Sequence, residues 1–172
     1  MSNMPSATQA PISREKWYKR IGYTPRKSQA MMEQAIKDGA RYIGYFAFPR
    51  AGKSFGAARF AEPMLLQPEF HAWIVAPTYA LGSKEFGYIW NDFAETGFLK
   101  LADRKNFDIR GGNCRIHFPW GALLEVVSAE NPASLRAEEL DLLILAEAAE
   151  MAPELHERHL FVRVEKRKGI TI

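Results

Sequence analysis

The feature that most constrains the fold of this chain is the run AFPRAGKS at residues 47–54, which follows the apolar stretch 42–46. A strand that enters a turn of small residues, ends in Gly-Lys-Ser and opens a helix is typical of a phosphate-binding loop. Backbone N–H groups of such a loop point at a polyphosphate, and the helix that follows adds its positive end. Lys53 is expected to meet the β- and γ-phosphates, and the Ser54 hydroxyl is expected to reach Mg²⁺. The sequence therefore predicts that the chain binds ATP or a close analogue.

Ala47 departs from this pattern, which has glycine at the same position. Alanine adopts positive φ less readily than glycine, but it is small enough for a tight loop. An ordinary turn between a strand and a helix is the alternative interpretation, and the placement of the run before a helical pattern favours the phosphate loop. The residues expected to hold the nucleotide are Ala51, Gly52, Lys53, Ser54 and Phe55.

The composition is that of one ordinary globular domain, because 47% of the 172 residues are hydrophobic and 25% are charged. The formal net charge of +3 permits a nucleic-acid partner without proving one. Cys114 is the single cysteine, which excludes an intramolecular disulfide and fits a reducing compartment. No apolar stretch has the length of a membrane span. We expect a flexible N-terminal tail at 1–20, one domain at 21–172, and no membrane partner.

Helical and strand patterns alternate along the first half of the chain. Thr24 is a good N-cap and Pro25 suits the first helical position, and apolar residues recur at helical spacing after them. Unbroken apolar sequence predicts a short buried strand before a second amphipathic helix. The elements predicted are helices at Pro25–Lys37, Ser54–Leu66 and Ser83–Glu95, and strands at Arg41–Ala47 and Ala72–Ala76.

The second half begins with short apolar stretches separated by glycines, which predict antiparallel strands. An unbroken apolar run then indicates a strand buried on both faces of a parallel sheet. The expected fold is an α/β P-loop NTPase of the ASCE or RecA-like type, with a mostly parallel sheet, flanking helices and an antiparallel β insertion. Because a strand pattern is cut off at the last residues, we expect a fragment of a longer protein. The predicted elements are strands at Asn106–Arg110, Cys114–Phe118, Leu123–Ser128, Leu140–Leu145 and Gly169–Ile172, and a helix at Pro153–His159.

A P-loop ATPase also needs a carboxylate that holds Mg²⁺ and usually a second one that orients the attacking water. Residues 142–150, LLILAEAAE, have the form of the Walker B motif, in which four apolar residues precede Asp-Glu. Glu147 is the candidate catalytic carboxylate, but Ala146 stands where the metal-holding Asp is expected, so hydrolysis should be slow. Three explanations remain open: an Asp→Ala change made to disable the site, a naturally degenerate site, or a misplaced motif whose true ligand is Asp141 or Glu150.

Shorter motifs lie near the predicted phosphate loop and near the run that resembles Walker B. The sequence has TPR at 24–26 and Gln29 ahead of the loop, VAPTY at 75–79, and SLR at 134–136 before the run that ends in EAA at 147–149. In order and content, the motifs resemble the ATPase domain of the large subunit of tailed-phage terminases, the motors that package DNA into procapsids. The resemblance covers about residues 23–172.

The resemblance implies roles for individual residues. Gln29 resembles a glutamine that reads adenine, since its amide offers both a donor and an acceptor to the base edge. Arg50 would bind the phosphates together with Lys53 and is a candidate catalytic residue. Arg136 resembles an arginine offered in trans to the γ-phosphate of a neighbouring subunit, although Ala137 replaces the glycine that the family has beside it.

The resemblance also implies cofactors and partners: ATP with Mg²⁺, double-stranded DNA, a homo-oligomeric ring on a portal protein, and the small terminase subunit, in the cytoplasm of a host cell. One alternative is a helicase-like superfamily 2 ATPase, which shares the glutamine ahead of the loop. A second is a nucleotide-gated DNA-binding or assembly module without turnover, which Ala146 would favour. His156 and His159 have a spacing that suits a metal, but without an evident third ligand a solvated helix face explains them better.

Overall fold

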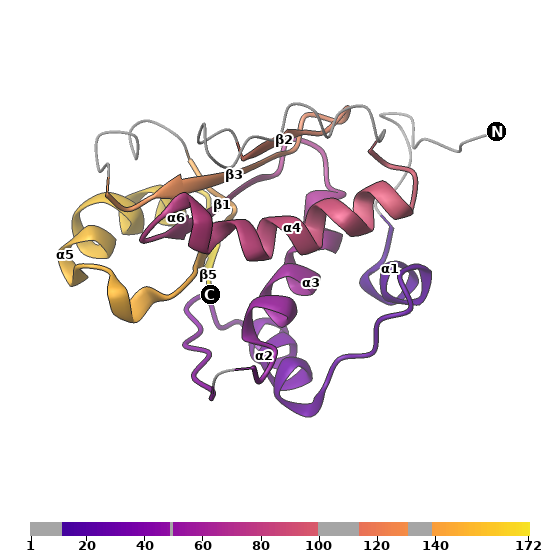
Figure 1. Ribbon diagram of the computed structural model, residues 1–172, viewed down its shortest axis with the longest axis horizontal. Helices are drawn as coiled ribbons and strands as arrows, with labels where there is room; N and C mark the ends of the chain where they lie inside the picture. The colour runs from indigo at the N-terminus through magenta and orange to yellow at the C-terminus, as the bar shows by residue number, and fades with distance from the viewer. Residues whose placement is uncertain (1–11, 49, 100–113, 131–138) are drawn as a thin grey trace.

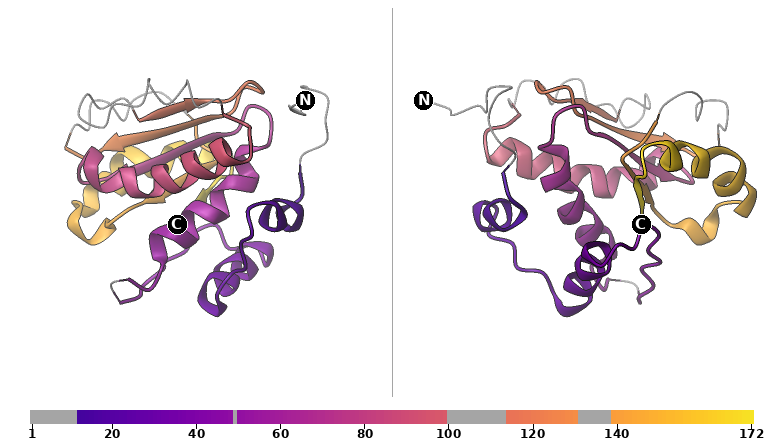
Figure 2. Two further views of the ribbon diagram at one scale, coloured as in Figure 1. Left: turned by 45° about the vertical axis from the view of Figure 1, so that its right-hand side comes forward. Right: turned by 180° about the vertical axis from the view of Figure 1, so that it is seen from behind.

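The computed structural model describes residues 12–48, 50–99, 114–130 and 139–172. A five-stranded sheet with the strand order β2-β3-β1-β4-β5 lies at its centre. Helices pack on both faces of this sheet, so the domain has three layers (Figures 1 and 2). Within the described ranges, no helix is long and apolar enough to cross a membrane.

The sheet is mostly parallel, as predicted. β1 pairs in parallel with β3 and β4, and β4 pairs in parallel with β5. The antiparallel pair is β2 with β3, but β3 also pairs with β1, so this hairpin is part of the main sheet rather than a separate insertion. The strand predicted at 106–110 lies outside the described residues. The strands are β1 (His71–Ala76), β2 (Arg115–His117), β3 (Leu123–Ser128), β4 (Leu142–Leu145) and β5 (Ile170–Thr171).

The helices follow the predicted pattern with shifted ends. The predicted start of the fourth helix at Ser83 is four residues too late, because Thr78 caps it and its hydroxyl accepts a hydrogen bond from the Leu81 backbone N–H at 3.4 Å. The predicted helix at 153–159 continues to residue 166 through a π-helical turn at His156–Leu160. The helices are α1 (Arg14–Arg20), α2 (Lys27–Lys37), α3 (Lys53–Leu65), α4 (Tyr79–Glu95), α5 (Pro153–Leu155) and α6 (Phe161–Lys166), with a 3₁₀ turn at Ala148–Glu150.

The apolar core is divided by the central strand β1. Ala72 and Ile74 belong to the larger cluster, which they share with side chains of α1, α3 and α4. Trp73 and Val75 belong to the second cluster, together with side chains of α5 and α6. Successive residues of a strand face opposite sides, so an unbroken apolar strand must be covered on both faces. The two clusters explain why this part of the sequence shows no polar alternation.

The strand predicted at Arg41–Ala47 is wrong for most of its length. Only Tyr42 forms a β-bridge, in parallel with Thr171, and the Ile43 N–H donates to the Thr171 carbonyl oxygen at 2.9 Å. Residues 44–47 find no strand partner among the described residues, because β5 pairs with this segment only at Tyr42. The bridge nevertheless places the segment beside β5, and β5 separates it from β4. The segment therefore enters the phosphate loop from the edge of the sheet.

Part of the expected N-terminal tail is folded. Residues 14–20 form α1, which begins after Ser13, whose hydroxyl accepts a hydrogen bond from the Lys16 N–H. Trp17 is completely buried against Phe93 and Phe98, with ring centroids 4.9 and 5.6 Å away. A fully buried tryptophan removes a large apolar surface from water, which is enough to hold a helix of only two turns in place.

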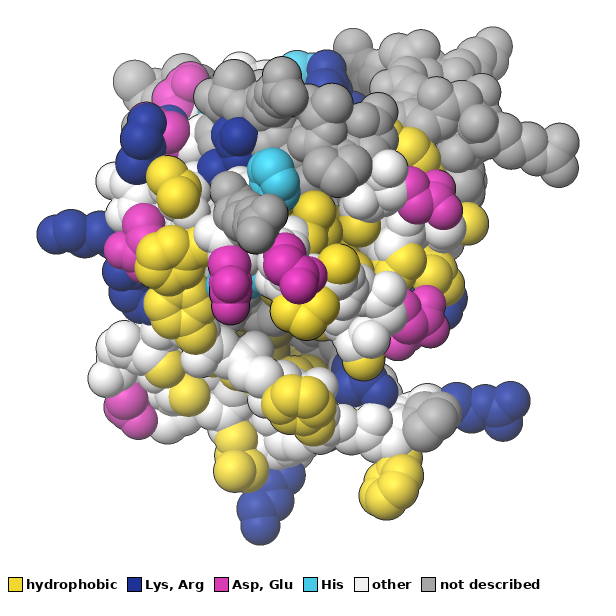
Figure 3. Space-filling model, turned by 90° about the vertical axis from the view of Figure 1, so that its left-hand side faces the viewer, with side chains coloured by type: hydrophobic (Ala, Val, Ile, Leu, Met, Phe, Trp, Pro, Cys, Tyr) yellow, Lys and Arg dark blue, Asp and Glu magenta, His cyan; other side chains and the backbone are white. Residues whose placement is uncertain are grey.

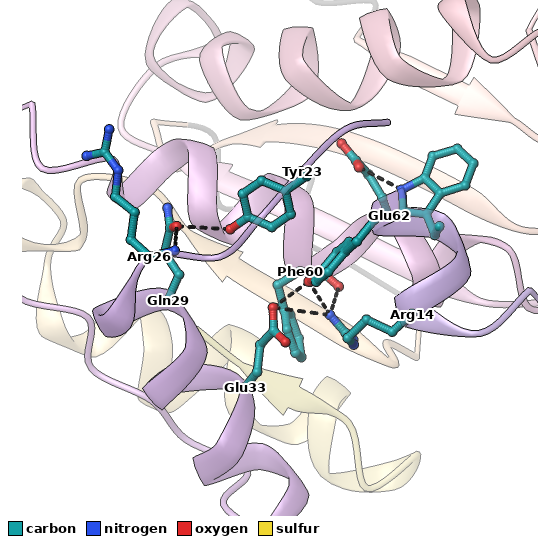
Figure 4. A network of polar contacts seen from close by, with 9 residues as sticks. Arg14, Tyr23, Arg26, Gln29, Glu33, Phe60 and Glu62 are labelled. Carbon is teal, nitrogen blue, oxygen red and sulfur yellow. Dashed lines mark hydrogen bonds and ion pairs between the residues drawn. The ribbon is translucent and has the colours of Figure 1, made fainter. Parts of the chain in front are cut away.

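Buried charges connect α1, α3 and α4 next to this tryptophan. The Trp17 indole N–H donates to Glu62 Oε2 at 2.9 Å, and the contact is visible in Figure 4. Arg59 Nη1 donates to Glu62 Oε1 at 2.7 Å and also forms an ion pair with Asp92. Its guanidinium lies 4.4 Å from the ring centroid of Phe55, at the start of α3. The network thus links the N-terminal helix to the helix that follows the phosphate loop.

Glu62→Gln should make the stability of the domain less dependent on pH. Burial raises the pKa of Glu62 from 4.5 to about 7, while Arg59 and the Trp17 indole oppose the rise. The folded state therefore binds the proton more tightly than the unfolded state, so the stabilisation is fully present below the ordinary pKa of 4.5 and is lost as pH rises through about 7. We expect the urea midpoint to fall between about pH 5 and about pH 8 in the unmodified protein and to change less in Glu62→Gln. Equal changes in both proteins would contradict this role.

Candidate nucleotide-binding site

The predicted phosphate loop combines two residues at positive φ with the start of a helix. Lys53 is the first residue of α3, one residue before the predicted start, and Gly52 precedes it at φ 86°. Arg50 also has positive φ, at 64°, which is uncommon for a residue with a side chain and typical of functional turns. The Lys53 ammonium donates to the Ala47 carbonyl oxygen at 2.7 Å and so lies over its own loop. The ammonium and the positive end of α3 are in the same place, as the predicted phosphate site requires.

A cavity of about 540 Å³ brings this loop together with the end of β4. Its walls include Lys53 and Ser54 on one side and Ala146 and Glu147 on the other. The volume is within the range of small-molecule sites, roughly 300–1,000 Å³. Glu147 has left-handed backbone angles, φ 54° and ψ 45°, two residues after the end of β4. Figure 3 shows a hollow on the face of the molecule that carries the C-terminal helices, with hydrophobic and acidic side chains at its edge.

The geometry separates the candidate catalytic carboxylate from the two alternative metal ligands. Glu147 lines the cavity, whereas Asp141 and Glu150 do not. Asp141 lies before the first residue of β4, where its Oδ2 accepts hydrogen bonds from the His71 N–H at 2.9 Å and from Arg167 at 2.7 Å. Ala146 is buried at the other end of the strand, in the cavity wall. The Walker B assignment at this position stays a prediction, and a misplaced motif is the weakest of the three explanations, because neither Asp141 nor Glu150 lines the cavity.

Glu85 is a cavity residue that the motif analysis missed. It lies on α4, is only 4% exposed, and lines the same cavity as Ser54 and Glu147. The sequence signal was its position on the apolar face of α4, three residues after Gly82 and four before Ile89. Asp92 is the other buried carboxylate of α4 and forms an ion pair with Arg59, so the burial of Glu85 needs an explanation of its own.

The donor set of the cavity suits Mg²⁺, which prefers oxygen ligands and is usually held by one or two carboxylates together with phosphates and water. The Ser54 hydroxyl and the carboxylates of Glu85 and Glu147 are hard oxygen donors in one cavity. The described residues contain no group of three His, Cys, Asp or Glu side chains that could hold a metal without phosphates or water as further ligands. His156 lines the cavity and His159 is exposed, and neither joins such a group.

No family model matches the sequence, and no curated protein matches it. Among solved structures, the domain is similar to the large terminase ATPase domain of Thermus phage P74-26, with a TM-score of 0.75 and 21% identity over 95% of this chain and 69% of that chain. An arginine-to-alanine mutant of the same phage domain gives a TM-score of 0.73 and 22% identity over 94% and 68% of the two chains. This chain has the fold of a terminase ATPase domain. The expected P-loop fold is thereby confirmed.

The domain has a second cavity, of about 510 Å³, which also reaches the predicted phosphate loop. Its walls include Gln29, Arg50 and Phe55. The Gln29 side chain is almost completely buried; its Oε1 accepts hydrogen bonds from the Arg26 N–H at 2.8 Å and the Tyr23 hydroxyl at 3.0 Å (Figure 4). Its Nε2 donates to the Gly52 carbonyl oxygen at 3.2 Å. Gln29 therefore connects the start of α2 to the phosphate loop.

Part of the predicted terminase site lies outside the described residues. Arg136, the predicted trans arginine, is there together with Ala137, so its role stays a prediction. Arg50 is described and exposed, at the edge of the second cavity. Gly52 lines the second cavity, whereas Lys53 and Ser54 line the first, so both cavities reach the predicted phosphate loop; Ala51 lines neither.

Proposed function

We propose that this chain is the ATP-binding and ATP-hydrolysing motor domain of a viral DNA-packaging terminase, which couples hydrolysis to the translocation of double-stranded DNA into a procapsid. The observation that carries the proposal is the shared cavity of Lys53, Ser54 and Glu147 in a domain with the terminase ATPase fold. This cavity joins a phosphate-binding loop to a carboxylate at the exit of a buried parallel strand. That combination suits phosphoryl transfer to water.

The side chains of the cavity have separate roles in the proposed reaction. Lys53 leaves the Ala47 carbonyl oxygen and binds the β- and γ-phosphates, where its charge is better compensated. Arg50 binds the phosphates from the side of the second cavity. Ser54 would hold Mg²⁺, which offsets phosphate charge when bound. Glu147 orients and deprotonates the attacking water, and Arg136 of a neighbouring subunit would stabilise charge that develops on the γ-phosphate.

The proposed partners follow from the same assignment: double-stranded DNA, a homo-oligomeric ring on a portal protein, and the small terminase subunit, in the host cytoplasm. The second candidate is a nucleotide-gated DNA-binding or assembly module, and Ala146 favours it, because the wall of the cavity lacks a carboxylate there. A helicase-like ATPase is less well supported, since the structural likeness described above is to a terminase ATPase domain.

The function is tested by calorimetric titration of the chain with ATP and Mg²⁺, followed by hydrolysis measurements with and without linear duplex DNA. Binding of ATP together with hydrolysis that responds to DNA supports a motor. Binding of ATP and DNA without turnover, even in the Ala146→Asp protein, supports the assembly module. A chain that binds no nucleotide would overturn both candidates.

Gln29→Ala should reduce the preference for ATP over GTP by about tenfold, because the amide would distinguish the two base edges, whereas the loss of its bonds to Tyr23, Arg26 and Gly52 affects both nucleotides alike. Titrations with both nucleotides measure the preference. Tyr23→Phe is the matched control, since it removes one hydrogen bond to Gln29 but keeps the amide. Equal losses of ATP and GTP affinity in Gln29→Ala would mean that Gln29 only positions the loop through Gly52.

A further inference from the structure

Glu85 is the buried titratable side chain of the cavity to which the proposed mechanism gives no role. Its Oε2 atom is buried and has no hydrogen-bond partner. An unsatisfied carboxylate oxygen in a protein interior costs on the order of 1–3 kcal/mol or more, so such atoms usually have a partner in the working state of the site. Apolar residues surround this position on α4, and a leucine would be the ordinary choice for a helix face of this kind.

The neighbours of Glu85 are groups that act on phosphate and metal. Burial raises its pKa, and hydrogen bonding from the Ser54 hydroxyl is the strongest of the interactions that oppose the rise. The charge of Lys84 also lowers the pKa, and the charge of Glu147 raises it. Ser54, the predicted Mg²⁺ ligand, is therefore within reach of this carboxyl group, and Glu147 is near enough to repel it.

The packing of α4 explains how Glu85 reaches Ser54. Gly82, one turn earlier, packs directly against the sheet, because a Cβ atom there would lie 2.6 Å from Val126 Cγ1 and 3.2 Å from the Ala76 Cβ. The missing side chain lets the start of α4 approach β1 and β3 closely, next to the carboxyl end of β1. The next turn of the helix then brings Glu85 into the cavity wall beside the first turn of α3.

We propose that the Glu85 carboxylate, together with the Ser54 hydroxyl, holds nucleotide-bound Mg²⁺ and so replaces the aspartate that is missing at Ala146. This inference rests on the proposed function, because the cation arrives with the phosphates. Its basis is the unpartnered carboxylate oxygen, the shared cavity with Ser54, and the absence of a carboxylate from the position at the end of β4. Mg²⁺ would give the buried charge of Glu85 a partner. The carboxylate would then bind the cation instead of accepting a hydrogen bond from the Ser54 hydroxyl.

The test measures binding of Mn²⁺, a paramagnetic substitute for Mg²⁺, to the ADP complex by electron paramagnetic resonance. Glu85→Gln keeps the shape of the side chain and an oxygen that accepts from Ser54, but it removes the charge. We expect Mn²⁺ affinity in the ADP complex to fall at least ~10-fold, while ADP affinity in EDTA is unchanged or higher. Glu95→Gln, an exposed change on the same helix, should alter neither value.

A second variant separates a ligand from a residue that only positions Ser54. If Glu85 replaces the missing aspartate, Ala146→Asp in the Glu85→Gln background should restore Mn²⁺ affinity. Unchanged Mn²⁺ affinity in Glu85→Gln would overturn the proposal and leave Glu85 as a positioning residue, and so would a loss that Ala146→Asp does not restore. ADP binding in EDTA tests the proposed function separately from the metal ligand, since a chain that binds no ADP contradicts the proposed function itself.

Discussion

Ala146→Asp is expected to raise the rate of ATP hydrolysis by about 100-fold, which is the cost of misplacing a catalytic group by roughly 1 Å. Ala146 directly follows β4 and precedes Glu147, so a carboxylate there would fix Mg²⁺ relative to the water that Glu147 orients. Glu85 reaches the cavity from α4 instead, and a ligand from that side supplies affinity for the metal without the same alignment. Single-turnover hydrolysis of ATP by the two proteins, each saturated with nucleotide, measures the difference.

Ala148→Asp is the matched control for this gain. Ala148 lies in the same cavity wall two residues further on, where a carboxylate follows Glu147 instead of preceding it. The control should leave the rate within a few-fold of the unmodified protein. If the unmodified chain already hydrolyses ATP at a typical rate for this chemistry, roughly 1–100 per second, position 146 is not the one that limits it.

Lys53→Ala should weaken ATP and ADP binding by about 10–100-fold. A charged hydrogen bond to a phosphate contributes roughly 1.5–3 kcal/mol, and each 1.4 kcal/mol is a factor of ten in affinity. Calorimetry measures both affinities. The loss should exceed that of any other single lysine, because among the lysines of the described residues only Lys53 lines either cavity.

Lys37→Ala controls for the general loss of positive charge, since Lys37 is exposed at the end of α2 and lines neither cavity. It should bind nucleotide like the unmodified protein. Circular dichroism should show that Lys53→Ala remains folded, because the hydrogen bond it loses is to the Ala47 carbonyl oxygen of an exposed loop. A folded Lys53→Ala protein with unchanged nucleotide affinity would refute the phosphate loop assignment.

The parts of the fold that the sequence predicted well depend on neighbours along the chain. The turn at 50–52 and the helix after it follow from small residues and from a glycine that takes positive φ. The strands β1 and β4 follow from unbroken apolar runs between breakers. Their carboxyl ends had to meet the phosphate loop at one edge, because parallel strands in such a sheet run in the same direction.

The elements that the prediction missed depend on partners distant in sequence. The short α1 has no strong helical pattern, and it is held by Trp17, whose indole binds Glu62, 45 residues away. The strand expected at 41–47 has suitable residues, but a strand also needs a partner, and β5 offers one only at Tyr42. Gln29 has the right chemistry for adenine, yet only the folded chain shows that Tyr23, Arg26 and Gly52 already occupy its amide.

The sequence by itself determined the turn at 50–52, the helix after it and the buried strands, because each is a local pattern with a fixed spacing. The phosphate loop and the missing aspartate at Ala146 are predictions from the same kind of local pattern. Tertiary structure alone decided that Glu85 lies in the cavity of Ser54, since the two residues are on different helices whose separation is set by Gly82 and the sheet beneath it. A carboxylate on an apolar helix face is ambiguous until its neighbours are known. Packing determines those neighbours, and packing depends on contacts between residues far apart in the chain.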